Sequence, residues 1–200
     1  MKVIGLTGGI AMGKSRAAAA FRGAGLPVFD ADAEVHALQA EGGRALPQIS
    51  AAFPGTVRSG QSGKLVLDRP RLRVAVLGDP AALDRLEAIL HPMVREAERK
   101  FLAVARRRRA RAAVLDIPLL FERRGRSGMD VVVAVSAPAA VQASRLRRRG
   151  TLSPPQVRAI LARQLPDRER RRRADVVIQT GLSRAHARRA LSRLIRSLSA

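Results

Sequence analysis

Residues 2–15 read Lys-Val-Ile-Gly-Leu-Thr-Gly-Gly-Ile-Ala-Met-Gly-Lys-Ser, and this stretch decides the fold. Residues 3–6 are mostly apolar, which is typical of a buried parallel strand. Residues 8–15 match the phosphate-loop spacing G-x-x-x-x-G-K-[ST], and the alanine run at 17–20 favours a helix directly afterwards. A strand, a glycine loop and a helix in this order predict a site for nucleotide phosphates.

The residue types of this loop suit a polyphosphate, which is a dense anion. Backbone N–H groups and the positive end of the following helix can surround such an anion. Lys14 can reach the β- and γ-phosphates, and the Ser15 hydroxyl can ligate Mg²⁺. The residues that we expect to contact ATP are Gly8, Gly9, Ala11, Met12, Gly13, Lys14, Ser15 and Arg16.

Composition narrows the class of protein. With 200 residues, 46% of them hydrophobic, the chain can form one domain with a small insertion. The absence of cysteine excludes disulfides and thiolate metal sites. No apolar run approaches the ~18 residues of a membrane span, and the first strand begins at the N-terminus without a signal peptide. We therefore expect a cytoplasmic protein with no membrane partner.

The formal net charge of +22 indicates affinity for anions. A nucleic-acid-binding surface would explain this charge, and so would arginines spread over solvated helices that serve a polyanionic substrate. The chain has no Trp, no Tyr and five Phe, so it offers few platforms on which bases could stack. We favour the second interpretation, which argues against nucleic acid as a partner.

Strands and helices alternate along most of the chain. Apolar runs predict strands near residues 3–6, 27–29, 113–116, 130–135 and 176–178. Helices are expected near residues 14–22, 33–39, 79–109, 138–149, 154–165 and 183–198, the last with an apolar stripe of Leu191, Leu194, Ile195 and Leu198. The alternation predicts an α/β fold, a five-stranded parallel sheet flanked by helices of the P-loop NTPase, nucleoside-monophosphate-kinase-like class.

The segment between the second and third strands has a different pattern. Residues 41–109 show no strand and are predicted to form a helical substrate insertion. Because Pro92 lies inside the helical pattern of this segment, we expect a break or a kink at His91. The predicted nucleotide-binding core is then residues 1–40 and 110–200.

Three carboxylates follow predicted strands, at the edge where α/β sheets bind ligands. Of Asp30 and Asp32, one can act on a hydroxyl or hold a metal while the other caps the next helix. We expect Asp30 to be structural and Asp32 functional. Asp116 ends the third strand and is a candidate metal ligand together with Ser15. His91 either faces a substrate or makes a local hydrogen bond.

Two arginine-dense helices lie between the fourth and fifth strands, separated by Gly150. A small kinase needs mobile arginines that neutralise the transferring phosphoryl group, an acceptor pocket and a group that orients the acceptor hydroxyl. We expect residues 140–170 to close as a helical lid, which would also exclude water. The insertion and Asp32 can supply the other two parts.

Several motifs together resemble the dephospho-CoA kinase family over nearly the whole chain. They are Gly5–Ile10 with Gly13-Lys14-Ser15, Phe29-Asp30-Ala31-Asp32, Leu86-Glu87 with His91-Pro92, Asp116–Leu120 with Glu122, Gln142 with Arg145, Arg163-Gln164 and Ala174–Ile178. The phosphate loop alone is shared by many proteins, but the other motifs as a set are specific.

The resemblance implies ATP-dependent phosphorylation of the ribose 3′-hydroxyl of dephospho-CoA, which gives coenzyme A and ADP in the last step of coenzyme A biosynthesis, with Mg²⁺ as cofactor. It implies Lys14, Asp32 and Arg145 as catalytic residues, with Asp32 on the acceptor side and Arg145 contacting phosphate from the lid. The substrate-binding residues would be Asp32, His91, Leu119 and Glu122. The expected partners are ATP and dephospho-CoA, and the expected assembly is a monomer or a small homo-oligomer.

The chain also departs from the family pattern. Members often have Gly-Ser at Ala11-Met12, Thr at Arg16, and an Asn where this chain has Gln179-Thr180-Gly181. The last difference leaves the adenine contacts open. Two other functions also stay open, namely another small-molecule or nucleoside-monophosphate kinase of the same architecture, and a basic RNA-binding protein with a regulatory nucleotide site.

Overall fold

The structure, a computed structural model, describes residues 1–123, 125–150, 153–162 and 164–197. Its contacts divide the chain into two compact units, the first formed by Met1–Asp30 and Leu102–Ala200 and the second by Ala31–Phe101. The boundaries expected from the sequence, including the lid at 140–170, stay predictions. Arg163 and Leu198 lie outside the described residues. Within those residues, no helix has the length and hydropathy needed to cross a membrane.

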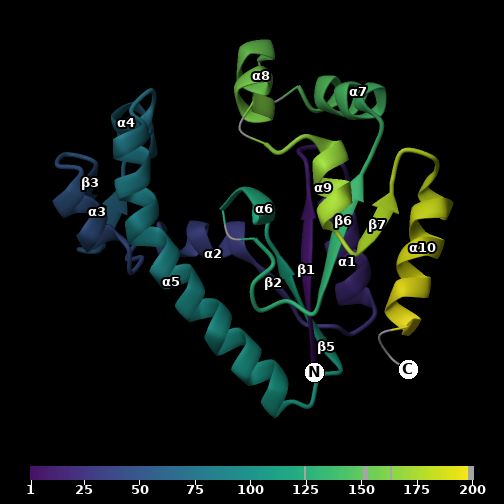
Figure 1. Cartoon of the computed structure of the whole chain (residues 1–200). Helices are drawn as coiled ribbons and strands as arrows, with labels where there is room; N and C mark the ends of the chain where they lie inside the picture. The colour runs from purple at the N-terminus through teal and green to yellow at the C-terminus, as the bar shows by residue number, and fades with distance from the viewer. Residues whose placement is uncertain (124, 151–152, 163, 198–200) are drawn as a thin grey trace. The chain divides into compact units, whose positions relative to one another are not determined.

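The first unit is built on a parallel sheet (Figure 1). Its elements are β1 (Lys2–Gly8), α1 (Lys14–Gly23), β2 (Val28–Asp30), β5 (Ala112–Asp116), α6 (Leu120–Arg123), β6 (Val131–Ser136), α7 (Ala139–Arg149), α8 (Pro154–Ala162), α9 (Asp167–Arg173), β7 (Val176–Gln179) and α10 (Arg184–Ser197). In the described part of the chain, five parallel strands form the sheet in the order β2-β5-β1-β6-β7. The predicted α/β fold class is confirmed.

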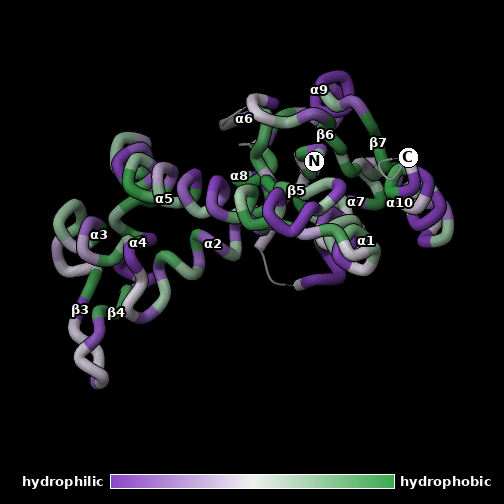
Figure 2. The backbone as a smooth tube through the Cα atoms, turned by 90° about the horizontal axis from the view of Figure 1, so that it is seen from below, coloured by the Kyte–Doolittle hydropathy of each residue, from purple (hydrophilic) through white to green (hydrophobic). Residues whose placement is uncertain are grey.

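The core of this unit follows from the alternation of side chains along its strands. Ile4 and Leu6 of β1 point to the same face of the sheet and pack with Phe21 of α1 and Leu191 of α10. Phe21 is fully buried, which contributes about 2–3 kcal/mol. Figure 2 shows hydrophobic colour along β5 and β6, and hydrophilic colour over much of α9 and α10.

A glycine in β1 allows close packing on the opposite face. A Cβ on Gly5 would collide with Met129 Sδ and would lie 3.2 Å from Leu120 Cδ2. A larger residue at this position would force the side chains of Met129 and Leu120 to shift, so the glycine lets them lie close to the central strand. Leu120 is the first residue of α6, the helix that carries Glu122.

The second unit contains a short antiparallel hairpin that the sequence analysis did not anticipate. Its elements are α2 (Ala31–Leu38), α3 (Leu46–Ala52), β3 (Val57–Ser59), β4 (Leu65–Leu67), α4 (Arg69–Val76) and most of α5 (Pro80–Arg107). The expectation of no strand within 41–109 is wrong, because β3 pairs with β4. Three residues per strand are too few for a period-2 pattern to stand out, whereas the fold buries Leu67 against Leu46 and Phe53.

Helix α5 runs from Pro80 to Arg107 with Pro92 inside it. A break at His91 is therefore wrong, and the alternative expectation of a kink there stays a prediction. Leu86 and Leu90 are buried in the apolar core of the second unit, and this burial holds the helix together beside Pro92, whose own side chain is exposed. The start signal of α5 acts as its residue type suggests, since Asp79 Oδ1 accepts the backbone N–H of Ala82 at 3.0 Å.

Candidate active site

The phosphate loop joins the end of β1 to the start of α1. Its backbone is left-handed at two residues, with φ +59° at Ala11 and +100° at Gly13. The backbone N–H groups of Ala11, Gly13, Lys14 and Ser15 have no acceptor within the described residues. Unpaired N–H groups at the start of a helix attract anions, because the helix dipole adds positive potential there. The loop therefore has the form of a phosphate cradle.

Lys14 forms an ion pair with Asp116 at the carboxyl edge of the sheet. Nζ lies 2.6 Å from Oδ1, and the two side chains are 16% and 4% exposed, respectively. Asp116 ends β5 and stands in register with Leu6 of β1, so the sheet itself brings the carboxylate beside the loop. The pair holds the lysine at the edge of the cradle.

The oxygen groups at this edge suit a hard cation. Ser15 is exposed at the start of α1 and offers a hydroxyl, and Asp116 offers a carboxylate. Mg²⁺ prefers oxygen ligands and is commonly held by one or two protein groups together with substrate phosphates. Among the described residues, no group of three His, Cys, Asp or Glu side chains could hold a metal by itself. This donor set fits Mg²⁺ bound largely by phosphate oxygens.

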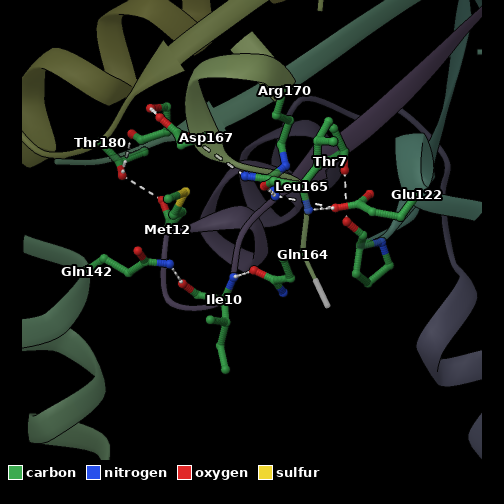
Figure 3. A network of polar contacts seen from close by, with 12 residues as sticks. Thr7, Ile10, Met12, Glu122, Gln142, Gln164, Leu165, Asp167, Arg170 and Thr180 are labelled. Carbon is green, nitrogen blue, oxygen red and sulfur yellow. Dashed lines mark hydrogen bonds and ion pairs between the residues drawn. The ribbon is translucent and has the colours of Figure 1, made fainter. Parts of the chain in front are cut away.

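Three consecutive carbonyls of the loop accept hydrogen bonds from side chains elsewhere in the first unit. The pairs are Gln142 Nε2 to Ile10 O at 2.9 Å, Arg145 Nη1 to Ala11 O at 3.3 Å and Thr180 Oγ1 to Met12 O at 2.6 Å. Figure 3 shows the first and the last of these bonds. Of the N–H groups between these carbonyls, that of Met12 donates to Gly9 O at 3.1 Å, whereas that of Ala11 stays available to a ligand.

Arg145 is half-buried and donates to the protein at three acceptors. Besides Ala11 O, these are Thr180 Oγ1 at 3.0 Å and Thr180 O at 2.6 Å. The arginine thus lies directly beside the phosphate loop, on the helix that opens the predicted lid. Its contact with phosphate stays a prediction.

Glu122 and Arg170 form a buried ion pair next to the loop, and Leu119 lies half-buried just before α6. Glu122 Oε1 accepts the backbone N–H of Leu165 at 2.7 Å, while its Oε2 is buried with no partner within the described residues. A Cβ on Gly9 would lie 3.3 Å from Arg170 Nη1, so a larger residue would press on the arginine. The substrate contact expected of Glu122 stays a prediction.

Asp32 and His91 belong to the second unit. Asp32 is exposed in the first turn of α2, two residues after β2 ends. Asp30 ends β2 in register with Asp116, and its carboxylate lies 3.8 Å from Arg22. The structural role expected of Asp30 stays a prediction. His91 Nε2 lies 3.9 Å from Glu87 Oε2, one helical turn away, and its side chain is 46% exposed. The substrate roles of Asp32 and His91 stay predictions.

The sequence analysis gave no role to four residues that touch this loop region. They are Gln142, Gln164, Arg170 and Thr180. Gln142 and Gln164 stood in the family-like motifs, and this was the signal that could have singled them out. Arg170 was hidden among arginines, although its spacing of three residues from Asp167 is that of a helical ion pair.

The parallel sheet, the loop after its central strand and the lysine paired with a carboxylate at the sheet edge define a P-loop kinase fold. Solved structures share this fold. A dephospho-CoA kinase from Campylobacter jejuni superposes with a TM-score of 0.66 at 23% identity, over 98% of this chain and 97% of that one. The crystal structure of TT1252 from Thermus thermophilus gives 0.83 at 34% identity, over 100% and 98% of the two chains.

Sequence comparison narrows the class to one family. The dephospho-CoA kinase family matches residues 2–185. A relative named dephospho-CoA kinase, from Gluconobacter oxydans, is 52% identical over 202 residues, which cover 99% of this chain and 98% of the relative. The chain belongs to the dephospho-CoA kinase family, and the resemblance noted from its motifs is confirmed.

Proposed function

We propose that this protein transfers the γ-phosphoryl group of ATP to the ribose 3′-hydroxyl of dephospho-CoA, giving coenzyme A and ADP in the last step of coenzyme A biosynthesis. The observation that carries the proposal is the 52% identity to a dephospho-CoA kinase over nearly the full length of both chains. The unpaired N–H groups of the phosphate loop support it, because they suit the triphosphate of the donor.

The reaction is an in-line displacement at the γ-phosphorus. The ribose oxygen forms a bond to phosphorus while the bond to the β-γ bridging oxygen breaks, and ADP leaves with that oxygen. Lys14 and the loop N–H groups stabilise the charge that develops on the phosphates. Asp32 orients the hydroxyl and accepts its proton, and Arg145 neutralises charge from the lid. His91, Leu119 and Glu122 would bind the acceptor.

Ser15 would hold Mg²⁺ directly and Asp116 would hold it through water. When bound with ATP, the ion supplies positive charge to the β- and γ-phosphate oxygens. Lys14 must then exchange part of its ion pair with Asp116 for the phosphates. We propose that the protein works in the cytoplasm as a monomer or a small homo-oligomer.

A coupled assay of ADP release tests the activity directly. Purified protein should release ADP with dephospho-CoA as sole acceptor, and far less with AMP, CMP or pantetheine derivatives. Robust turnover of AMP or CMP in place of dephospho-CoA would assign the chain to another kinase activity. Steeply salt-dependent RNA binding without any phosphoryl acceptor would instead favour the RNA-binding interpretation.

Replacing Asp32 with asparagine tests its role in the transfer. Because a positioned base contributes about 10²–10⁴-fold to such reactions, kcat should fall by at least about a hundredfold. The Kd for ATP, measured by calorimetry, should change by less than about threefold. Asp30→Asn is the matched control, since it removes a neighbouring carboxylate and should keep turnover within a few-fold of the parent. Normal turnover of Asp32→Asn would show that another group orients the hydroxyl.

A further inference from the structure

The peptide groups of Ile10 are held from both sides by glutamine side chains. Gln164 Oε1 accepts the backbone N–H of Ile10 at 3.1 Å, and Gln142 Nε2 donates to its carbonyl at 2.9 Å (Figure 3). Gln142 lies on α7, and Gln164 is the second residue after α8, which ends at Ala162. The two glutamines therefore bracket most of the predicted lid segment and meet at one residue of the phosphate loop.

The orientation of each amide is fixed by its partner. A backbone N–H can only donate and a backbone carbonyl can only accept, so position 164 must supply an acceptor and position 142 a donor. Both side chains are half-buried, which limits how well water could replace them. The two positions thus have opposite chemical requirements at the same loop residue.

Gln164 stands on a rigid support. The next residue, Leu165, donates its N–H to Glu122 Oε1 at 2.7 Å, and its carbonyl accepts from Arg170 Nη2 at 2.6 Å. Arg170 is 2% exposed and Glu122 is 11% exposed, so both partners are confined. The buried ion pair between α6 and α9 therefore fixes the backbone from which Gln164 reaches Ile10.

The two hydrogen bonds to Ile10 constrain the backbone conformation of the residues that follow it. Gly9 precedes Ile10 and tolerates many backbone angles, whereas Ala11 follows it with φ +59°, a left-handed conformation that strains an L-residue. A loop of this kind needs external bonds to keep that conformation. We propose that Gln142 and Gln164 are positioning residues, which hold Ile10 so that the N–H groups of Ala11, Gly13, Lys14 and Ser15 converge on the nucleotide phosphates. The inference rests on the proposed ATP-dependent function.

Donor and acceptor requirements can be tested with four substitutions. Glutamate only accepts when ionised and lysine only donates, so Gln164→Glu and Gln142→Lys should keep the bond to Ile10, whereas Gln164→Lys and Gln142→Glu should lose it. If only the added charge mattered, the lysine variant would bind the anionic nucleotide more tightly than the glutamate variant at both positions. Which of the lysine and glutamate variants binds nucleotide more tightly at each position therefore separates a positioning role from an effect of charge.

The measurement is the Kd for Mg-ADP and Mg-ATP by titration calorimetry at about 150 mM salt, which screens distant charges. Each bond-losing variant should bind about tenfold more weakly than the bond-keeping variant at its own position, so that lysine is better at 142 and glutamate is better at 164. The exposed Gln48 of α3 provides the controls Gln48→Glu and Gln48→Lys, which should bind like the parent. Lysine tighter at both positions, or no difference at either, would overturn the proposal.

If a charged variant does not fold, neutral variants at the same two positions still test the proposal. Gln142→Met and Gln164→Met should each raise the Kd several-fold, and unchanged affinity in both would overturn the proposal. Nucleotide binding also separates this inference from the proposed function. A parent protein that binds Mg-ADP but does not phosphorylate dephospho-CoA would contradict the proposed activity, while the order of the four variants would still decide the role of the glutamines.

Discussion

Replacing Arg170 with methionine should destabilise the first unit by about 3 kcal/mol. Arg170 is 2% exposed, donates to Leu165 O at 2.6 Å and lies 3.5 Å from Glu122 and 3.6 Å from Asp167. Methionine fills similar space, so the loss comes from a carbonyl and two carboxylates left without their cation. Removing one partner of a buried ion pair costs about 3–5 kcal/mol. The low end applies because Asp167 is 26% exposed and still accepts a bond from Ser136.

Thermal unfolding measures this loss. The chain has no Trp and no Tyr, so unfolding must be followed by far-ultraviolet circular dichroism or by calorimetry rather than by intrinsic fluorescence. For a protein of this size, 3 kcal/mol corresponds to a fall in Tm of about 6–12 °C. Arg170→Lys keeps the charge but not the planar fork, and should fall between the parent and Arg170→Met. The exposed neighbour on the same helix supplies the control, since Arg171→Met should change Tm by less than about 2 °C.

A double variant identifies the cause. If the cost arises from an uncompensated carboxylate, adding Glu122→Gln to Arg170→Met should recover part of the lost Tm, although Glu122→Gln alone lowers it. Strict additivity of the two changes would show that Glu122 and Arg170 are not coupled. A Tm of Arg170→Met within about 2 °C of Arg171→Met would refute the reasoning altogether, because the buried guanidinium would then contribute no more than an exposed one.

Three further predictions concern single positions. Gly13→Ala should weaken Mg-ADP binding about tenfold, because φ +100° strains any L-residue although Thr180 leaves room for the methyl group; unchanged affinity in calorimetry would contradict this. Pro92→Ala should raise Tm, because it restores a backbone donor at an exposed position inside α5; a lower Tm would show that Pro92 contributes to packing. A hydrogen bond from Lys100, and to a smaller extent one from Arg44, holds the pKa of Glu96 below its usual value of 4.5. The ionised carboxylate therefore stabilises the folded protein above that pH, and this contribution is lost as the pH falls through the lowered pKa. The Tm of Glu96→Gln should accordingly lie below the parent at about pH 6 and match it at about pH 3, and a constant gap would contradict the linkage.

The sheet could be predicted from the sequence because each of its long strands carries its own signal. The run from Val131 is continuously apolar, and the strand at β1 is followed by an unmistakable loop motif. Lys14 and Asp116 could be placed at the same edge because parallel strands end together there. At these positions the local sequence pattern favours the same structure as the packing of the fold, so each segment can be predicted from its own sequence.

The hairpin β3–β4 and the continuity of α5 could not be predicted in this way. Three-residue strands form because Leu67 is buried in the core of the second unit, and that burial is a property of the packed structure rather than of the segment. Pro92 likewise reads as a helix breaker from local rules alone. In both places tertiary contacts outweigh the local preference, and such contacts cannot be inferred from the hydrophobic periodicity or the helix and strand propensities of the segment.

Helix α9 shows the same limit for charge. Its sequence, Asp-Arg-Glu-Arg-Arg-Arg-Arg, reads as a solvated run, and Arg171, Arg172 and Arg173 are indeed exposed. Arg170 has the same side chain and is nearly fully buried, because its place on the helix directs it toward Glu122 and the backbone of Leu165. The chemical role of an arginine in such a run is therefore set by helical phase. A net charge counts these four residues alike, although one of them is buried against Glu122 and Leu165 and the other three are exposed.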